Sequence, residues 1–159
     1  GGRMELRSRV GIEHVGCVVR DLDPVVAHMR ADFADIEFQY YVYRPMHAWS
    51  YGKPVENYHL KIAMGAIPGH DTGIELIQWV SGEGVHRDFV GCGKGGMHHI
   101  AYRVENFDYW KEKFSKTCAP FIFEAETEDE KNGYRRCFYA WDDTAGMVFE
   151  IKEQARFRR

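Results

Sequence analysis

Two histidines occupy matching places in two similar stretches of the sequence. The stretch "EHVGCVVRDLD", residues 13–23, aligns without a gap on "HHIAYRVENFD", residues 98–108. The alignment pairs His14 with His99. Neighbouring residues of a strand point to opposite faces, so we expect His98 to face away from His99. The repeat therefore singles out His14 and His99 as candidate functional imidazoles.

A glutamate recurs near the end of each half of the chain. Glu75 lies in "IELI" and Glu150 in "FEI", each inside an apolar, strand-like run. A charged group in such a run is costly unless it is paired or binds a metal. Each residue taken alone is more often a hydrogen-bonded core residue or a solvent-facing one. Taken together, two imidazoles and two carboxylates at corresponding places favour a site for one divalent transition metal ion: Zn, Co, Mn, Ni or Fe.

The segments around these residues predict two copies of one β-α-β-β-β unit. Each opening strand ends at an aspartate, Asp23 or Asp108, which can cap a helix over residues 24–33 or 109–117. Strand-like segments follow at residues 36–43, 58–65 and 73–80, and again at 120–124, 133–141 and 146–153. A helical turn is expected at 85–90 and an irregular connection at 44–57. The chain is therefore an α+β protein with modules at 1–88 and 89–159 that form one structural domain.

The bulk composition excludes several classes of protein. The 159 residues can bury a core, and the net charge of −3 disfavours a nucleic-acid partner. No apolar stretch approaches the roughly 20 residues that span a bilayer, and we expect no signal peptide. The four cysteines are far apart in the sequence, which favours a reduced, cytoplasmic protein: Cys17, Cys92, Cys118 and Cys137. We expect the partner to be a small-molecule substrate.

These features resemble the vicinal oxygen chelate superfamily of glyoxalases, bleomycin and fosfomycin resistance proteins, extradiol dioxygenases and methylmalonyl-CoA epimerases. The resemblance covers residues 13–153 and implies an open, cleft-shaped mixed sheet with helices on its outer face. It also implies a metal held by His14, Glu75, His99 and Glu150. The segments "HLKIAMGAIPGHDTGIELIQ" and "GKGGMHHIAYRV" are most similar to the epimerase branch.

The resemblance implies a metal-dependent isomerase or epimerase that abstracts a proton next to a carbonyl through a metal-stabilised enolate. Glu75 and Glu150 belong to opposite modules and are the expected proton carriers, with Lys61 as a further catalytic candidate. Four more side chains are candidates for substrate binding: Trp79, Arg103, Glu56 and Trp49.

Three other functions stay open at this point. A glyoxalase-type lactoylglutathione lyase would use the same ligands. A protein that binds an antibiotic or natural product without catalysis would fit the aromatic content of 14%. An extradiol dioxygenase is disfavoured because Glu75 stands where those enzymes carry a histidine. Exposed edge strands on both modules favour a homodimer.

Overall fold

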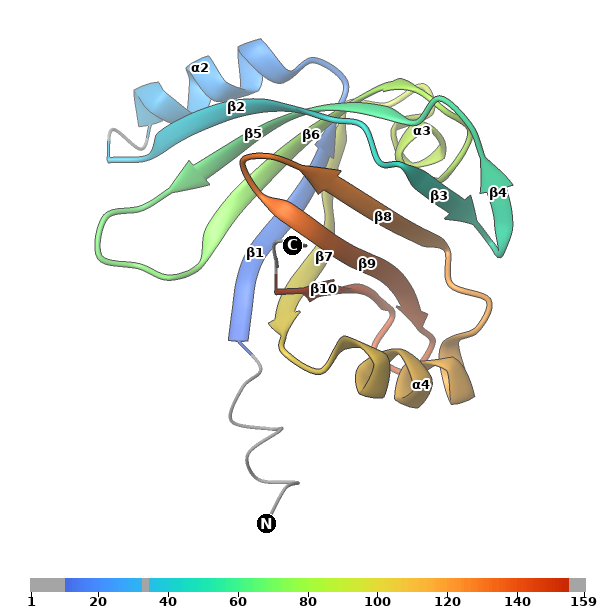
Figure 1. Ribbon diagram of the computed structural model, residues 1–159. Helices are drawn as coiled ribbons and strands as arrows, with labels where there is room; N and C mark the ends of the chain where they lie inside the picture. Colours follow the sequence, from blue (N-terminus) through green and yellow to red (C-terminus); the bar gives the residue numbers. More distant parts are fainter. Residues whose placement is uncertain (1–10, 33–34, 155–159) are drawn as a thin grey trace.

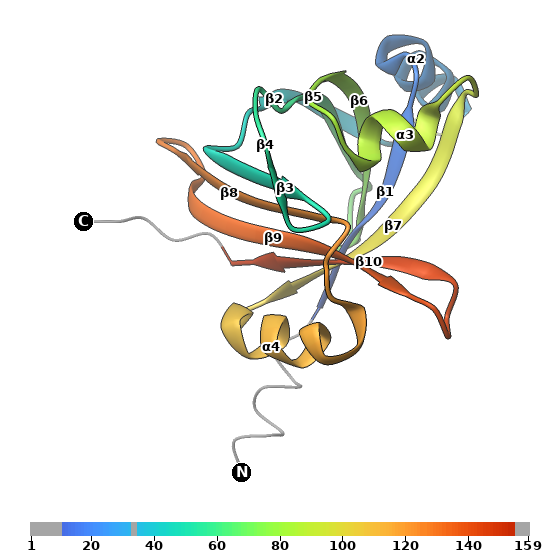
Figure 2. The same cartoon turned by 90° about the vertical axis from the view of Figure 1, so that its right-hand side faces the viewer.

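A single curled, mixed sheet runs through the described residues and carries its two longer helices on the outside (Figures 1 and 2). The computed structural model describes residues 11–32 and 35–154. Within them the strands are β1 (Gly11–Val19), β2 (Glu37–Tyr43), β3 (His47–Ser50), β4 (Lys53–Val55), β5 (His59–Ala66), β6 (Gly73–Ser81), β7 (Gly95–Val104), β8 (Phe123–Asp129), β9 (Gly133–Asp142) and β10 (Met147–Glu153). They lie in the order β2-β5-β6-β1-β7-β10-β9-β8-β3-β4. The predicted α+β class and open mixed sheet are confirmed.

The internal repeat becomes two modules joined at the centre of the sheet. The first contains β1, helix α2 (Leu22–Asp32), β2, β5 and β6, and the second contains β7, helix α4 (Phe107–Cys118), β8, β9 and β10. Strands β1 and β7 pair antiparallel, while β6 runs parallel to β1 and β10 runs parallel to β7. The last strand of each module is therefore beside its first. A short helix, α3 (Val85–Val90), joins the modules at the predicted position.

Helices α2 and α4 cover the convex face because each buries an apolar stripe there (Figure 1). Leu22 and Val26 of α2 pack in the first module, and Phe107 of α4 packs in the second. Both helices begin earlier than predicted. In α2 the Leu22 N–H donates to the side-chain oxygen of Gln78 at 2.9 Å, so a neighbouring strand supplies the cap. None of the helices in the described residues is long and apolar enough to cross a membrane.

The concave face holds a third apolar core, which the two modules share. Leu60 and Ile77 come from the first module, and Phe123 and Tyr139 from the second. All four side chains are buried. Both modules contribute side chains to this core. Unfolding of one module would therefore expose the buried side chains of the other.

The segment 44–57, expected to be irregular, forms a hairpin of β3 and β4. It leaves the first module and extends the sheet of the second, with Ala48 of β3 opposite Ala125 of β8. The Met46 N–H also donates to the Glu126 carbonyl at 2.8 Å. The hairpin covers the edge of β8, and Pro54 on β4 discourages further strand pairing there. Local sequence could not reveal this pairing because its partner strand is some 75 residues away.

We expect the two modules to unfold as one unit. Phe123 lies in the shared core and Phe138 lies under α4, each about 1% exposed or less. Replacing either by alanine should lower the free energy of unfolding by about 3–5 kcal/mol in a single transition. Urea denaturation followed by fluorescence and circular dichroism measures this. The exposed Lys116→Ala is the control, and a biphasic curve for one phenylalanine variant would show independent modules.

Candidate metal centre

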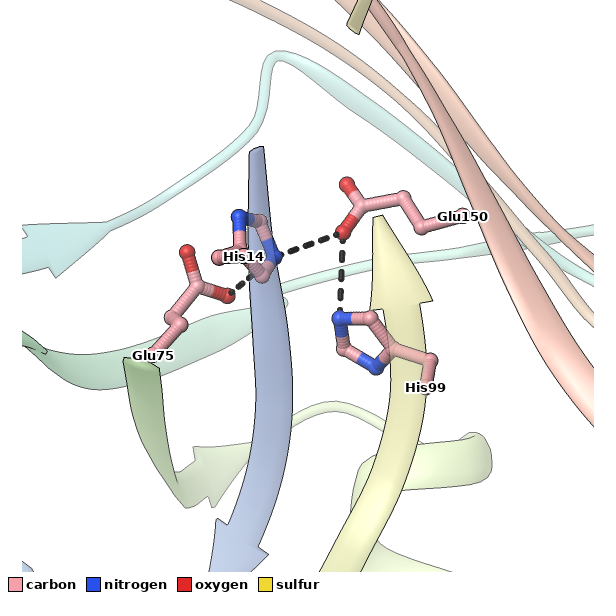
Figure 3. A group of neighbouring side chains, drawn as sticks. All are labelled: His14, Glu75, His99 and Glu150. Atoms are coloured by element: carbon pink, nitrogen blue, oxygen red, sulfur yellow. Dashed lines mark ion pairs between the residues drawn. The ribbon is translucent and has the colours of Figure 1, made fainter. Parts of the chain in front are cut away.

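Four adjacent strands carry the candidate ligands into one place. His14 lies on β1, Glu75 on β6, His99 on β7 and Glu150 on β10, the four strands at the middle of the sheet. One ligand atom from each lies within 4.8 Å of the ligand atoms of the other three. Figure 3 shows the side chains pointing toward one another from the four strands. The structure therefore brings together all four residues that the sequence predicts as metal ligands.

The strand register explains how these large side chains meet. Glu75 and His99 lie opposite Gly16, one on each side of β1. His14 and Glu150 lie opposite Ala101, one on each side of β7. Each pair of ligands thus flanks a small residue.

Gly16 and Ala101 are themselves repeat partners. A Cβ atom on Gly16 would overlap the His99 ring, so that ring occupies the space which glycine leaves. The repeat therefore supplies both the two histidines and the space beside them.

The facing atoms of the cluster are buried and poorly satisfied. Glu150 Oε1 lies 3.3 Å from His14 Nε2 and 3.1 Å from His99 Nε2, and Glu75 Oε1 lies 3.6 Å from His14 Nε2. Among the described residues, none of His14 Nε2, His99 Nε2 and Glu150 Oε1 has a hydrogen-bond partner of acceptable geometry. Buried polar atoms without partners are rare and require an explanation. Two imidazole nitrogens and two carboxylates are also a donor set suited to a divalent transition metal, so the residues fit such an ion.

The electrostatics of the cluster favour a cation. Burial disfavours the charged form of His14, but Glu75, Glu13 and Glu150 outweigh it and raise the pKa of His14 to about 10. Burial likewise opposes ionisation of Glu150, yet the neighbouring His14 and His99 hold its pKa well below the usual range. The carboxylates thus stabilise a proton on the His14 imidazole. A metal ion would displace that proton, because an imidazole must be deprotonated to act as a ligand.

Both imidazoles of the cluster are contacted on their other ring nitrogen, Nδ1. Glu13 Oε1 lies 3.3 Å from His14 Nδ1 and accepts a hydrogen bond from Lys152 Nζ at 2.6 Å. His98 Nδ1 lies 2.8 Å from His99 Nδ1. The expectation that His98 faces away from His99 is wrong, because a bulge interrupts the alternation of β7 at this residue. Sequence reasoning missed Glu13 and Lys152 in this role.

A cavity of about 50 Å³ adjoins the cluster on the concave side. Glu75 and Glu150 line it together with four aromatic side chains that sequence reasoning also missed: Tyr41, Tyr43, Phe123 and Tyr139. The Tyr41 hydroxyl donates to Glu75 Oε2 at 3.3 Å. The aromatic residues of 40–43 could have suggested this wall, because alternate residues of one strand share a face.

A larger chamber of about 410 Å³ lies beside the cavity, and Tyr41, Arg135 and Lys152 line both. Its charged lining residues are Arg103, Lys131, Arg135 and Lys152, with Glu13 and Glu153. Within the described part of the chain, the cations outnumber the carboxylates in this chamber although the whole protein carries a net charge of −3.

The other predicted site residues lie away from the cluster, with one exception. Lys61 is exposed on β5, and its neighbours Leu60 and Ile62 face the cavity instead. Trp79 donates its indole N–H to the Gly82 carbonyl at 2.7 Å and lines a separate groove with Glu56. Trp49 lines another groove along the hairpin. Arg103 does reach the outer chamber. The geometry thus separates the proton-transfer candidate Lys61 from the site, because strand alternation turns it to the opposite face.

The chain thus combines a duplicated β-α-β-β-β sheet with two histidines and two carboxylates at the centre of that sheet. The model of the Glyoxalase/Bleomycin resistance protein/Dioxygenase superfamily matches residues 13–138, and the chain belongs to this superfamily. The resemblance to the vicinal oxygen chelate proteins is thereby confirmed. No curated protein sequence matches the chain significantly.

Solved structures share the fold at low identity. Methylmalonyl-CoA epimerase from Mycobacterium tuberculosis is 20% identical, with a TM-score of 0.65 over 92% of this chain and 89% of that chain. A mutant methylmalonyl-CoA epimerase from Streptomyces coelicolor in complex with 2-nitronate-propionyl-CoA is 18% identical, with a TM-score of 0.55 over 93% of this chain and 96% of that chain. A mutant 4-hydroxymandelate synthase from Streptomyces coelicolor is 13% identical, with a TM-score of 0.60 over 95% and 50%. At these identities the comparisons establish the fold alone.

The space beside Gly16 provides a test of the cluster geometry. Gly16→Ala should displace the His99 ring and weaken Zn²⁺ binding by about tenfold or more, because the ligand geometry is disturbed. Gly11→Ala on the same strand is the matched control, since a Cβ atom there meets nothing within 4 Å. Competition against a chromophoric chelator measures the affinity. Equal affinities for both variants would mean that His99 does not contribute to binding.

Proposed function

We propose that this protein is a metal-dependent isomerase or epimerase that moves a proton on a carbon next to a carbonyl, with methylmalonyl-CoA as the favoured substrate. The observation that carries the proposal is the buried cluster of two histidines and two glutamates beside a small cavity. In the described part of the chain, three of its candidate ligand atoms lack hydrogen-bond partners. A divalent ion bound there supplies Lewis acidity toward a carbonyl oxygen of the substrate. The remaining steps belong to side chains of the chain itself.

The two glutamates are the proposed proton carriers. They enter from β6 and β10, on opposite sides of the central strands β1 and β7, and both line the cavity. Epimerisation needs one group to accept a proton on one face of a carbon and another to deliver it on the opposite face. The Tyr41 hydroxyl fixes the second oxygen of Glu75, which keeps that carboxylate aligned. Carboxylates from opposite modules therefore suit epimerisation better than a one-sided reaction.

The size of the cavity favours a small reacting group. A volume of about 50 Å³ is room for roughly three to five water-sized groups, at about 10–15 Å³ for each. A short acyl chain fits, with aromatic walls that exclude water from the reacting carbon. The rest of the substrate would lie in the chamber of about 410 Å³, whose excess of cations favours an anionic carrier such as coenzyme A.

The lyase and the non-catalytic binder are the competing proposals. A glyoxalase-type lyase requires the same ligands, and the cationic chamber would also accept the carboxylates of glutathione. The binder is favoured by the four aromatic walls of the cavity. The homodimer also stays a prediction, and β2, with Tyr40 and Val42 about half exposed, is the sheet edge available for it.

Deuterium exchange distinguishes these functions. The Co²⁺-loaded protein should exchange the α-proton of methylmalonyl-CoA in heavy water, followed by NMR. Treatment with EDTA should abolish exchange, and added Co²⁺ should restore it, because the substrate carbon is activated through the metal. Formation of lactoylglutathione from methylglyoxal and glutathione, without exchange, would favour the lyase. Stoichiometric metal binding with neither activity would favour the binder.

Replacement of one proton carrier tests the assignment of the carboxylates. Glu150→Gln should lower the exchange rate about 10²–10⁴-fold, because an amide cannot accept the proton. The exposed Glu112→Gln on α4 is the control for a charge change far from the site. Measured metal content of each variant separates loss of metal from loss of proton transfer. Full exchange by a metal-loaded Glu150→Gln variant would remove Glu150 from the mechanism.

A further inference from the structure

Two β-bulges interrupt the central strand pair, one immediately before each ligand histidine. On β1, Ile12 pairs with Tyr102 and His14 pairs with Ala101, so Glu13 is an extra residue. On β7, Gly16 pairs with His99 and the next residue of β1 pairs with Met97, so His98 is an extra residue. A bulge changes the direction of a side chain that regular alternation would send to the other face. The bulges therefore stand at corresponding places in the two modules.

Each bulged side chain contacts the Nδ1 atom of the ligand that follows it. Glu13 Oε1 lies 3.3 Å from His14 Nδ1, and His98 Nδ1 lies 2.8 Å from His99 Nδ1. The Nε2 atoms of both ligands remain directed at Glu150. A hydrogen bond at one ring nitrogen fixes the orientation of the imidazole and leaves the lone pair on the other nitrogen.

Further elements hold the two bulged side chains in place. Lys152 of β10 donates to Glu13 at 2.6 Å. The centroid of the His98 ring lies 4.8 Å from that of the Phe89 ring of α3 and 5.6 Å from that of the Tyr139 ring of β9. The supports come from strands β9 and β10 and from helix α3, so neither contact depends on the local strand alone.

We propose that Glu13 and His98 are positioning residues that orient the two ligand imidazoles toward the metal, one through a carboxylate and one through a neutral ring nitrogen. The inference rests on the metal site of the proposed function. The extra residue of each bulge thus orients the histidine that follows it, through a carboxylate in the first module and through a ring nitrogen in the second. The carboxylate makes His14 the more basic ligand, because an anionic acceptor increases the electron density on the imidazole.

Zinc affinity of a variant series tests this. Glu13→Ala and His98→Ala should each weaken Zn²⁺ binding about 10–100-fold, the range typical of outer-shell partners of metal ligands. Glu13→Gln keeps an acceptor without the charge and should lose less affinity than Glu13→Ala. His98→Asn offers an amide oxygen near the position of Nδ1 and should recover most of the loss. Ile12→Ala and Met97→Ala, exposed neighbours on the same strands, are the matched controls and should bind as the unaltered protein does.

Two readouts separate positioning from folding. The visible spectrum of the Co²⁺ form should shift in the alanine variants, while the circular dichroism of each metal-free variant should match that of the unaltered protein. Equal zinc affinity across the series would overturn the positioning role. Equal losses for His98→Asn and His98→Ala would overturn the hydrogen bond from His99. Absence of zinc binding by the unaltered protein would instead contradict the proposed function, and this inference with it.

Discussion

The rest of the structure depends on one constraint, which is that four ionisable side chains are buried at the centre of one sheet. His14, Glu75, His99 and Glu150 are each 6% exposed or less. Burial of unpaired charge is costly, so such a group persists only when the charges compensate one another or a cation. Here opposite charges share one small volume, and the strand order keeps them there. Removing one member would leave the others buried without compensation.

The rest of the architecture places these groups and keeps water from them. The parallel pairing of β1 with β6 and of β7 with β10 brings each module's histidine beside its own glutamate. The antiparallel pairing of β1 with β7 then brings the two halves together. Small residues between the four side chains provide the space, and the shared apolar core packs on the concave side. Strand pairing, strand order and core packing therefore all hold the same four side chains together.

Much of the fold and the cluster could be predicted because duplication leaves a record in the sequence. The pairing of His14 with His99 came from a gapless alignment, and Glu75 and Glu150 from their apolar surroundings. Lys61 shows a signal that was available: in "HLKIAMG" the apolar residues on either side of it belong on the opposite face of the strand. Alternation was sufficient to exclude it.

Other features could not be predicted because they depend on contacts distant in sequence. The hairpin of β3 and β4 forms against β8, so Trp49 and Glu56 lie where no local pattern indicates. The bulges at Glu13 and His98 arise from the register between β1 and β7. Periodicity assumes regular pairing, and it fails where the register shifts by one residue. The four clustered side chains could therefore be predicted, while Glu13 and His98 beside them could not.

The hairpin of β3 and β4 gives the two modules an additional connection through the sheet. The modules are connected by the chain near α3, by the pairing of β1 with β7, and again by β3 lying along β8. The last two are hydrogen-bonded seams at separate places on the sheet. A break in the peptide chain between residues 91 and 94 would therefore leave two fragments that still associate through these strand pairings. The protein could then be reconstituted from two fragments produced separately.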